Sequence, residues 1–481
     1  MEFVNSIPEA LSYDDVLLLP AYSDFLPHEA DISTEILPGI RLKVPIVSAA
    51  MDTVTEDKMA IALALQGGVG VIHRNLTPRE QAQQVLNVKR YLNFVIDNPY
   101  TVEPDQTIED VWEIMQNNDI SGLPVVENGV LSGIITSRDL RFCKDYRLKV
   151  RDVMTANPIA EVGTPAIQSA RDKFDTHKIE KLPVVDENGK LTGLITVKDM
   201  EKHDKFPNAA TDDSGRLLVG AAISPVDLDR RMPLLQQAKV DFVVLDTAHG
   251  TTKGVVQAVK TLKSKYETLV VAGNVATADG AKLLIDAGAD CIKVGVGPGS
   301  ICTTRIVAGI GVPQFSAVAE ACSVANSAGV PVIADGGIKF SGDIVKAIGA
   351  GASAVMLGNL LAGMKESPGR EILFEGRIFK AYRGMGSVAA IRKGSGDRYQ
   401  MNEGDEPVPE GVEGRVPFKG ELAPFVHQLI TGLRKGMGYT GCRTLSQLRN
   451  YKKFVRITAA GLRESHAHDV VITHEPPNYS R

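Results

Sequence analysis

Short apolar runs recur along the chain and alternate with longer stretches of mixed, helix-like composition. There are eight of these runs: Val44–Ser48, Val69–Ile72, Leu217–Ala222, Phe242–Leu245, Leu269–Ala272, Cys291–Val294, Val330–Ala334 and Ala354–Leu357. Continuous Val, Ile, Leu and Ala predict strands that are buried on both faces, as in a parallel sheet. Eight such strands alternating with helices predict an α/β fold, a closed (β/α)8 barrel of the TIM type.

A repeated pattern interrupts this series between the second and third predicted strands, at about residues 94–205. The motif Ile120–Val126 returns 59 residues later as Ile179–Val185. In each copy a helix-like stretch, 108–118 or 166–177, precedes two short strands joined by a turn that contains Asn-Gly. The repeat therefore predicts an independent module inserted into the barrel.

The two copies resemble a tandem pair of CBS domains, a regulatory module whose pairs often bind adenine or guanine nucleotides. Each copy ends in Thr-x-x-Asp, first as Thr136 and Asp139 and then as Thr196 and Asp199, and this Asp matches the family position that contacts a ribose. The resemblance implies purine-nucleotide binding at these residues. The alternative is that each Asp only caps the helix that follows it. The predicted segments are barrel at 1–93, CBS module at 94–205 and barrel again at 206–481.

Polar residues and glycines gather where the predicted barrel strands end. Asp246 follows one strand, Gly273 and Asn274 follow the next, and Asp335 and Asn359 follow the last two. The carboxyl ends of parallel barrel strands share one face, where barrel enzymes place their active sites. The sequence therefore predicts an active site on this face.

The loop 295–305 is the strongest chemical feature of the chain. Its glycines at 295, 297 and 299 allow the backbone to turn amides or carbonyls toward a ligand, and Cys302 stands at the end of the run. Backbone dipoles around a cysteine at a cavity favour a nucleophilic thiolate. The alternative is a small buried residue in a tight turn, but the position after a barrel strand favours the nucleophile.

This loop, Gly-Val-Gly-Pro-Gly-Ser-Ile-Cys-Thr-Thr, resembles the catalytic loop of the inosine 5′-monophosphate (IMP) dehydrogenase family. Further matching motifs are Ser48–Glu56, Gly273–Thr277, Ile333–Ile338, Tyr382–Ser387, Asp397–Tyr399 and Glu410–Val412. The CBS-like insert also stands at the family's position. The resemblance covers the whole chain and implies NAD-dependent oxidation of IMP to xanthosine 5′-monophosphate in guanine nucleotide biosynthesis.

The resemblance implies a role for each residue of the catalytic group. Cys302 would add to C2 of the hypoxanthine ring, and the adduct would lose hydride to NAD+ and leave a covalent intermediate that water hydrolyses. Thr304 would assist proton transfer and position the water. The long polar segment 393–420, rich in Gly, Glu and Pro, predicts a mobile flap. Its Arg398, beside Tyr399, would activate the water once the flap closes; without the resemblance Arg398 reads equally well as a solvated surface residue.

The resemblance also places the substrate. Asp335 would bind the ribose hydroxyls, with a helix N-cap as the alternative. Ala49 and Asn359 depart from the serines found in family members, and each change weakens one phosphate contact. The complete set of predicted substrate residues is Ser300, Asp335, Gly336, Gly337, Gly358, Asn359, Tyr382, Met385, Gly386 and Glu410, of which Met385, Gly386 and Glu410 would hold the base edge.

Two further ligands follow from the resemblance, NAD and a potassium ion. The predicted NAD residues are Asp246, Asn274, Gly295 and Gly297. No Gly-x-Gly-x-x-Gly opens a Rossmann unit, so the cofactor would lie in a groove on the barrel loops. The predicted K+ ligands are main-chain carbonyls of Gly297, Gly299 and Cys302, completed by Glu475 from a neighbouring subunit of a homotetramer.

Charge and cysteine content bound the setting of the protein. The 481 residues include 53 Lys and Arg against 58 Asp and Glu, a net charge of −5 that gives no general reason to bind nucleic acid or an anionic membrane. Five scattered cysteines indicate a reducing compartment rather than a disulfide framework or a zinc site. The first ten residues do not form a signal peptide. We therefore expect a cytoplasmic enzyme without a membrane partner.

Two other readings compete with this one. Guanosine 5′-monophosphate (GMP) reductase shares the barrel, the cysteine and the threonine, but characteristically lacks the CBS insert and the flap Arg-Tyr. A nucleotide-sensing regulatory protein with an inactive barrel is the other alternative. The joint presence of Cys302, Thr304, Asp335 and Arg398 argues for a working enzyme.

Overall fold

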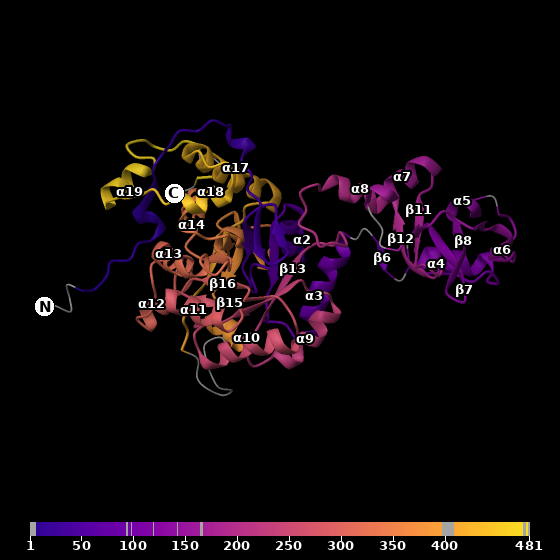
Figure 1. The fold of residues 1–481 in the computed structure, drawn as a ribbon, viewed down its shortest axis with the longest axis horizontal. Helices are drawn as coiled ribbons and strands as arrows, with labels where there is room; N and C mark the ends of the chain where they lie inside the picture. Colours follow the sequence, from indigo (N-terminus) through magenta and orange to yellow (C-terminus); the bar gives the residue numbers. More distant parts are fainter. Residues whose placement is uncertain are drawn as a thin grey trace. The chain divides into compact units, whose positions relative to one another are not determined.

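The computed structural model describes residues 6–92, 95–97, 99–118, 120–141, 143–163, 167–396, 408–474 and 478–479. The chain divides into two compact units (Figure 1). One comprises Met1–Tyr91, Asn208–Asp212 and Leu217–Arg481, and the other Leu92–Pro207 with Asp213–Arg216. Among the described residues, no helix has both the length and the apolar character needed to cross a membrane.

The first unit is a closed parallel barrel of eight strands, which confirms the predicted fold class. The barrel closes in the order β13-β14-β15-β16-β17-β18-β4-β5. All eight predicted runs are strands of the barrel, with ends moved by at most a few residues. The strands are β4 (Ile46–Ser48), β5 (Val69–Ile72), β13 (Val219–Ile223), β14 (Phe242–Asp246), β15 (Val270–Val275), β16 (Cys291–Val294), β17 (Val332–Asp335) and β18 (Ala354–Leu357).

Helices surround the barrel strands (Figure 1). In α10 (Lys253–Lys265) the buried Val255, Val259 and Leu262 recur at helical spacing, and Thr252 accepts a hydrogen bond from the Val255 amide at the first turn. The other barrel-unit helices of seven or more residues are α2 (Asp57–Leu65), α3 (Pro78–Tyr91), α9 (Leu228–Gln237), α11 (Ala278–Asp286), α13 (Gln314–Ala325), α14 (Ser341–Ala350), α17 (Leu422–Thr440), α18 (Leu445–Tyr451) and α19 (Ala459–Ser465).

Smaller sheets decorate the barrel. The apolar side chains of the hairpin β2 (Thr34–Leu37) and β3 (Ile40–Leu42) join the cluster inside the barrel. β1 (Val16–Leu18) pairs with β22 (Phe454–Arg456). A three-stranded antiparallel sheet contains β19 (Glu371–Phe374), β20 (Arg377–Arg383) and β21 (Glu413–Pro417). The segment predicted as a flap, 393–420, therefore ends in a paired strand, while its residues 397–407 lie outside the described residues.

The second unit contains two similar halves, each with its own apolar core. One half packs α4 (Ile108–Asn118) against the hairpin β7 (Gly122–Glu127) and β8 (Val130–Thr136). The other packs α7 (Ile167–His177) with the hairpin β11 (Lys181–Val185) and β12 (Leu191–Thr196). The shorter elements are β6 (Ile96–Asp97), α5 (Ser137–Leu140), α6 (Val150–Val153), β9 (Thr155–Ala156), β10 (Glu161–Val162) and α8 (Val197–Lys205).

Both Thr-x-x-Asp motifs form caps in this unit. The Thr136 hydroxyl donates to Asp139 at 2.7 Å at the start of α5, and the Thr196 hydroxyl donates to Asp199 at 2.6 Å at the start of α8. This capping is the alternative that the sequence left open, and it leaves nucleotide binding by the same carboxylates as a proposal.

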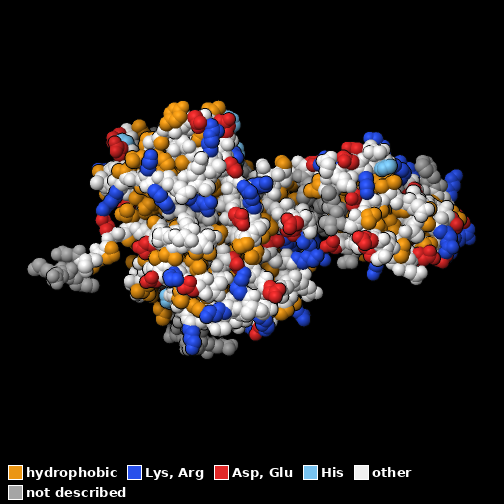
Figure 2. All heavy atoms as spheres, in the orientation of Figure 1, with side chains coloured by type: hydrophobic (Ala, Val, Ile, Leu, Met, Phe, Trp, Pro, Cys, Tyr) orange, Lys and Arg blue, Asp and Glu red, His pale blue; other side chains and the backbone are white. Residues whose placement is uncertain are grey.

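Acidic and basic side chains are interspersed over most of the face shown in Figure 2.

Candidate active site at the carboxyl ends of the barrel strands

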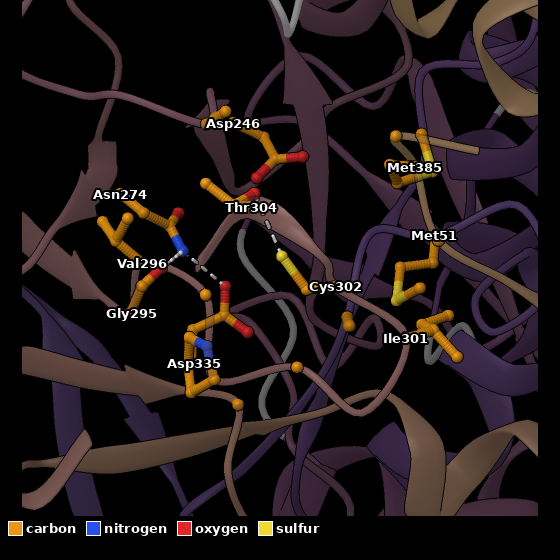
Figure 3. A pocket seen from close by; sticks show the side chains of 18 of the residues that line it. Met51, Asp246, Asn274, Gly295, Val296, Ile301, Cys302, Thr304, Asp335 and Met385 are labelled. Carbon is orange, nitrogen blue, oxygen red and sulfur yellow. Dashed lines mark hydrogen bonds between the residues drawn. The ribbon is translucent and has the colours of Figure 1, made fainter. Parts of the chain in front are cut away.

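A cleft of about 810 Å³ opens at the carboxyl ends of the barrel strands (Figure 3). A second cleft of about 1000 Å³ shares Met51, Asp335, Gly336 and Tyr382 with it, so the two are continuous. Every predicted active-site residue of the barrel that the structure describes lines one or both clefts. These residues are Asp246, Asn274, Gly295, Gly297, Gly299, Ser300, Cys302, Thr304, Asp335, Gly336, Gly337, Gly358, Asn359, Tyr382, Met385, Gly386 and Glu410.

The loop that carries Cys302 is held from two sides. Within the loop, the Cys302 amide donates to the Gly299 carbonyl at 3.1 Å. Across the cleft wall, the Thr303 amide donates to the Glu410 carbonyl at 2.9 Å, and the Val412 amide donates to the Ile301 carbonyl at 3.0 Å. These bonds fix the sulfur at the cleft through residues far apart in sequence.

Cys302 begins a short chain of hydrogen bonds. Its Sγ lies 3.2 Å from the Thr304 Oγ1, and the Thr304 hydroxyl donates to Glu410 Oε2 at 2.7 Å. Because a hydroxyl carries one proton and two lone pairs, Thr304 can accept from the thiol while it donates to the carboxylate. The arrangement offers a path for the thiol proton toward Glu410, a link that the sequence did not suggest.

The other cysteines of the barrel unit have different settings. Cys291 and Cys322 are buried, and burial raises the pKa of the Cys322 thiol to about 12 and raises the pKa of Cys291 as well. Cys442 is also buried, whereas Cys302 is partly exposed at the cleft. Thiols locked in the protonated form are poor nucleophiles. Of the four cysteines of the barrel unit, Cys302 is the one whose thiol is partly exposed at the cleft.

Asp335, at the end of β17, faces the cleft. Its Oδ2 accepts hydrogen bonds from the side-chain Nδ2 of Asn274 at 2.9 Å and from Lys293 Nζ at 2.8 Å (Figure 3 shows the Asn274 bond). The helix that follows, α14, is instead capped by Asp343, which accepts from the Phe340 amide at 3.0 Å. The N-cap alternative for Asp335 is therefore wrong.

Tyr382 supplies a neutral donor between the two clefts. Burial is the main cause that raises the pKa of its phenol to about 12, although a hydrogen bond with Ser300 acts in the opposite direction. The phenol therefore stays protonated at neutral pH. Ser300, Gly337, Gly358 and Asn359 line the same second cleft. Hydroxyl and backbone donors, with Arg305 and Lys339 also on the lining of this cleft, suit a phosphate group.

A buried ion pair fixes the strand that carries Tyr382. The Arg383 guanidinium donates to both carboxylate oxygens of Asp52, and Asn75 donates to the same carboxylate at 3.1 Å. Asp52 has no exposed side-chain surface, while Arg383 is 21% exposed. Although burial alone would raise the pKa of Asp52, the hydrogen bonds from Arg383 and Asn75 hold it below its usual range. No sequence motif linked these residues.

Gly295 allows two strands to meet closely. A Cβ at this position would lie 2.1 Å from the backbone oxygen of Asp335, and the Asn274 amide donates to the Gly295 carbonyl at 2.7 Å. Only glycine leaves room for this approach. The carbonyls of Gly297 and Cys302 accept no hydrogen bond from the described residues, which leaves two of the predicted K+ ligands available.

Three predicted site residues lie outside the described residues. They are Arg398, Tyr399 and Glu475. Conversely, Lys293 lines the cleft although no sequence motif predicted it as a site residue. A lysine inside an otherwise apolar strand was the available signal, because lysine is almost never fully buried unless it is paired.

A parallel (β/α)8 barrel whose carboxyl-end cleft contains a hydrogen-bonded cysteine, threonine and carboxylate has the architecture of a barrel enzyme. A family model described as the IMP dehydrogenase / GMP reductase domain matches residues 10–468. The chain belongs to this family.

Curated relatives match over nearly the full length. The inosine-5′-monophosphate dehydrogenase of Halalkalibacterium halodurans is 54% identical over 477 residues, which cover 98% of each chain. The enzyme of the same name from Aquifex aeolicus is 55% identical and covers 100% of this chain and 99% of its own. The Bacillus subtilis relative is 53% identical, with 98% of each chain covered.

A solved structure carries the other family name. It is GMP reductase from Trypanosoma brucei in complex with guanosine 5′-monophosphate, with a TM-score of 0.84, 41% identity, and coverage of 98% of this chain and 100% of that one. Because the match covers 98% of this chain, it includes the inserted unit, so the insert alone does not distinguish the two activities. The higher identity to proteins named IMP dehydrogenase remains the distinction between the two readings.

Proposed function

We propose that this protein oxidises IMP to xanthosine 5′-monophosphate with NAD+, in guanine nucleotide biosynthesis. The observation that carries the proposal is the hydrogen-bonded series Cys302–Thr304–Glu410 in the barrel cleft. Relatives at 53–55% identity over nearly the whole chain carry the name inosine-5′-monophosphate dehydrogenase.

Cys302 is the proposed nucleophile. Its sulfur adds to C2 of the hypoxanthine ring while its proton passes toward Glu410 through Thr304. C2 then gives up hydride, and the purine remains joined to the sulfur. Water adds at C2 and the carbon–sulfur bond breaks, which releases the product and restores the thiol. The sum is IMP, NAD+ and water giving xanthosine 5′-monophosphate, NADH and a proton.

The nucleotide lies across both clefts in this proposal. Asp335 accepts hydrogen bonds from the ribose hydroxyls, since its Oδ1 takes no hydrogen bond from a described residue. Ser300, Tyr382 and the backbone of Gly336, Gly337 and Gly358 hold the phosphate, with Asn359 beside them. Met385, Gly386 and Glu410 flank the base in the first cleft.

NAD+ occupies the remaining side of the first cleft and, when bound, accepts the hydride. The residues there fit a nicotinamide riboside, because Asp246 offers a carboxylate for hydroxyl groups and the side-chain oxygen of Asn274 has a second lone pair beside the one that Lys293 uses. Gly295 and Gly297 leave the backbone exposed beside them. These residues bind and orient the cofactor next to Cys302.

A potassium ion is the proposed cation of the catalytic loop. Two of its proposed ligands, the carbonyls of Gly297 and Cys302, fit a hard cation that takes oxygen ligands, and Gly299 is the third. Glu475 of the partner subunit completes this site in a homotetramer. The cation would hold the loop in the conformation that presents the sulfur.

Hydrolysis depends on the flap in this proposal. Arg398, with Tyr399 beside it, activates the water after the segment 393–420 closes over the cleft. The strand β21 ties the end of this segment to β20. The closing movement is therefore assigned to the residues that precede β21.

The second unit is proposed to be a tandem CBS module that binds purine nucleotides. Its two similar halves and the matching positions of Asp139 and Asp199 support this assignment. The five cysteines are all free thiols, which supports a cytoplasmic location.

The decisive test is an absorbance assay for NADH with IMP and NAD+ in potassium buffer. We expect turnover by the wild-type protein and none by Cys302→Ala, which should still bind IMP. A second arm supplies GMP with NADPH, and consumption of NADPH there would establish GMP reductase instead. A folded protein inactive in both arms would favour the regulatory protein with an inactive barrel.

A further inference from the structure

Lys293 lines the cleft at the carboxyl ends of the barrel strands, between residues assigned to different ligands. It is 1% exposed and projects from β16, the strand that leads into the Cys302 loop. Its ammonium group donates to Asp246 Oδ1 at 3.0 Å and to Asp335 Oδ2 at 2.8 Å. It also donates to the side-chain oxygen of Asn274.

Each of the three protons of the Lys293 ammonium group has a hydrogen-bond acceptor. The three acceptors come one each from β14, β15 and β17, which are Asp246, Asn274 and Asp335. Each acceptor stands at the carboxyl end of its strand. Since every proton has a partner, the group fixes the direction of all three side chains.

Charge balance in the cleft depends on the same residue. Asp246 and Asp335 have 4% and 20% of their side-chain surface exposed, and Lys293 is the cation that both contact. Without it, two carboxylates would share a poorly solvated site, which is strongly unfavourable. With it, the group of three carries one net negative charge.

We propose that Lys293 is the positioning residue that joins the nucleotide subsite to the cofactor subsite. The inference rests on the proposed function, which gives Asp335 to the substrate ribose and Asp246 to the nicotinamide riboside. Both Lys293 and Asn274 bind Oδ2 of Asp335, so that Oδ1 is turned toward the ligand. One ammonium group therefore sets both ribose-binding carboxylates at once.

The chain offers a matched control for this role. Lys89 is also buried, at 3% exposed, and also contacts two carboxylates, Asp212 at 3.1 Å and Asp241 at 2.7 Å. Asp241 immediately precedes β14, the strand whose last residue is Asp246. Five residues of strand separate them by roughly 16 Å. Lys89 thus has the same ionic surroundings at the end of the barrel away from the cleft.

The experiment compares Lys293→Met, Lys89→Met and the double variant Lys293→Met/Asp246→Asn in the full chain. Circular dichroism checks folding, calorimetry gives the dissociation constant for IMP, and steady-state rates give KM for NAD+. We expect Lys293→Met to weaken both by about 10- to 100-fold, the effect of losing charge-assisted hydrogen bonds. Lys89→Met should lose thermal stability but keep both constants within about twofold, because distant sites act independently.

The double variant separates positioning by charge from a merely structural role. It restores one net negative charge in the cleft, so it should recover most of the IMP affinity while NAD+ stays weakly bound. A packing role would give no recovery when a second residue is changed. If Lys293→Met alone does not fold, the charge-balanced double variant should fold and bind IMP.

Three results would overturn the inference. They are unchanged constants in Lys293→Met, equal losses in Lys89→Met, and a double variant that does not fold or binds IMP as weakly as the single variant. Failure of the proposed function is a separate result, because it would show in the wild-type protein as absence of NADH from IMP and NAD+.

Discussion

Replacing Arg383 by Met should destabilise the barrel unit because it leaves the carboxylate of Asp52 buried without its cation. Asp52 has no exposed side-chain surface, and after the change Asn75 is the one residue within the described ranges that would still donate to its carboxylate. Removing one partner of a buried ion pair costs about 3–5 kcal/mol. For a domain of this size, that corresponds to a fall of roughly 5–10 °C in the midpoint of thermal unfolding.

The pH dependence gives the sign of the effect. In the wild type the pKa of Asp52 is held below its usual range, so the pair contributes stability above the unfolded pKa and loses it only in acid, below that value. In Arg383→Met, burial dominates and should raise the pKa of Asp52. The variant is then penalised most at neutral pH, and its deficit should shrink as the pH falls and the carboxyl takes up a proton.

The assay is thermal inactivation of turnover at pH 7.5 and pH 5.5, which follows the barrel unit in a chain of two units. Lys365→Met is the control, since Lys365 and Glu421 form an exposed pair with 62% and 64% of their side-chain surface accessible. Exposed pairs contribute about 0–1 kcal/mol. Two results would contradict this prediction: a loss of stability in Arg383→Met no larger than in the control, or a loss that grows as the pH is lowered.

Three other variants test separate parts of the argument. Gly295→Ala should abolish most turnover, because its Cβ would lie 2.1 Å from the Asp335 oxygen; wild-type kcat/KM would contradict this. Arg398→Ala should show a normal burst of NADH and a slow steady rate, and equal losses in both phases would exclude a hydrolytic role. Replacing 92–207 by a short Gly/Ser linker should keep turnover and remove any response to ATP or GTP, since Lys89 and Asp212 already bring the flanking segments together. Retained nucleotide sensitivity would place regulation in the barrel.

The barrel could be predicted because its strands are buried on both faces, so each appears as an unbroken apolar run. β21 could not be predicted in this way. Its residues are mostly exposed, and the residues of β20 that pair with it lie 30 to 38 positions earlier in the chain, from Arg383 with Glu413 to Phe379 with Pro417. The Gly, Glu and Pro content of 393–420 indicated a loop, and only the long-range pairing with β20 orders its end as a strand.

The residues of the candidate site likewise include some that the sequence could predict and some that it could not. Motifs located Cys302 and Thr304 in the Gly-rich loop after β16, and Asp335 at the end of β17. The bond between Thr304 and Glu410 spans 106 positions, and the bond between Asp52 and Arg383 spans 331. No local pattern encodes such pairs. Lys293 differs, because a lysine within a doubly buried strand already requires nearby carboxylates.

The two ends of β14 show how the same kind of ion pair can serve stability or ligand binding. The difference is whether a carboxylate oxygen is left without a hydrogen-bond partner in the protein. At the amino end, Asp241 accepts from Lys89 and from the Val219 amide, and burial raises its pKa despite the lysine. Each of its oxygens accepts a hydrogen bond from the protein. At the carboxyl end, Asp246 accepts from Lys293, which also donates to Asp335 on β17. The lysine bond to Asp335 uses one oxygen and leaves the other for a substrate. This difference follows from barrel geometry, because loops close over the amino ends of the strands while the carboxyl ends line the cleft. A buried lysine between carboxylates therefore indicates a binding site only where an acceptor atom remains unpaired.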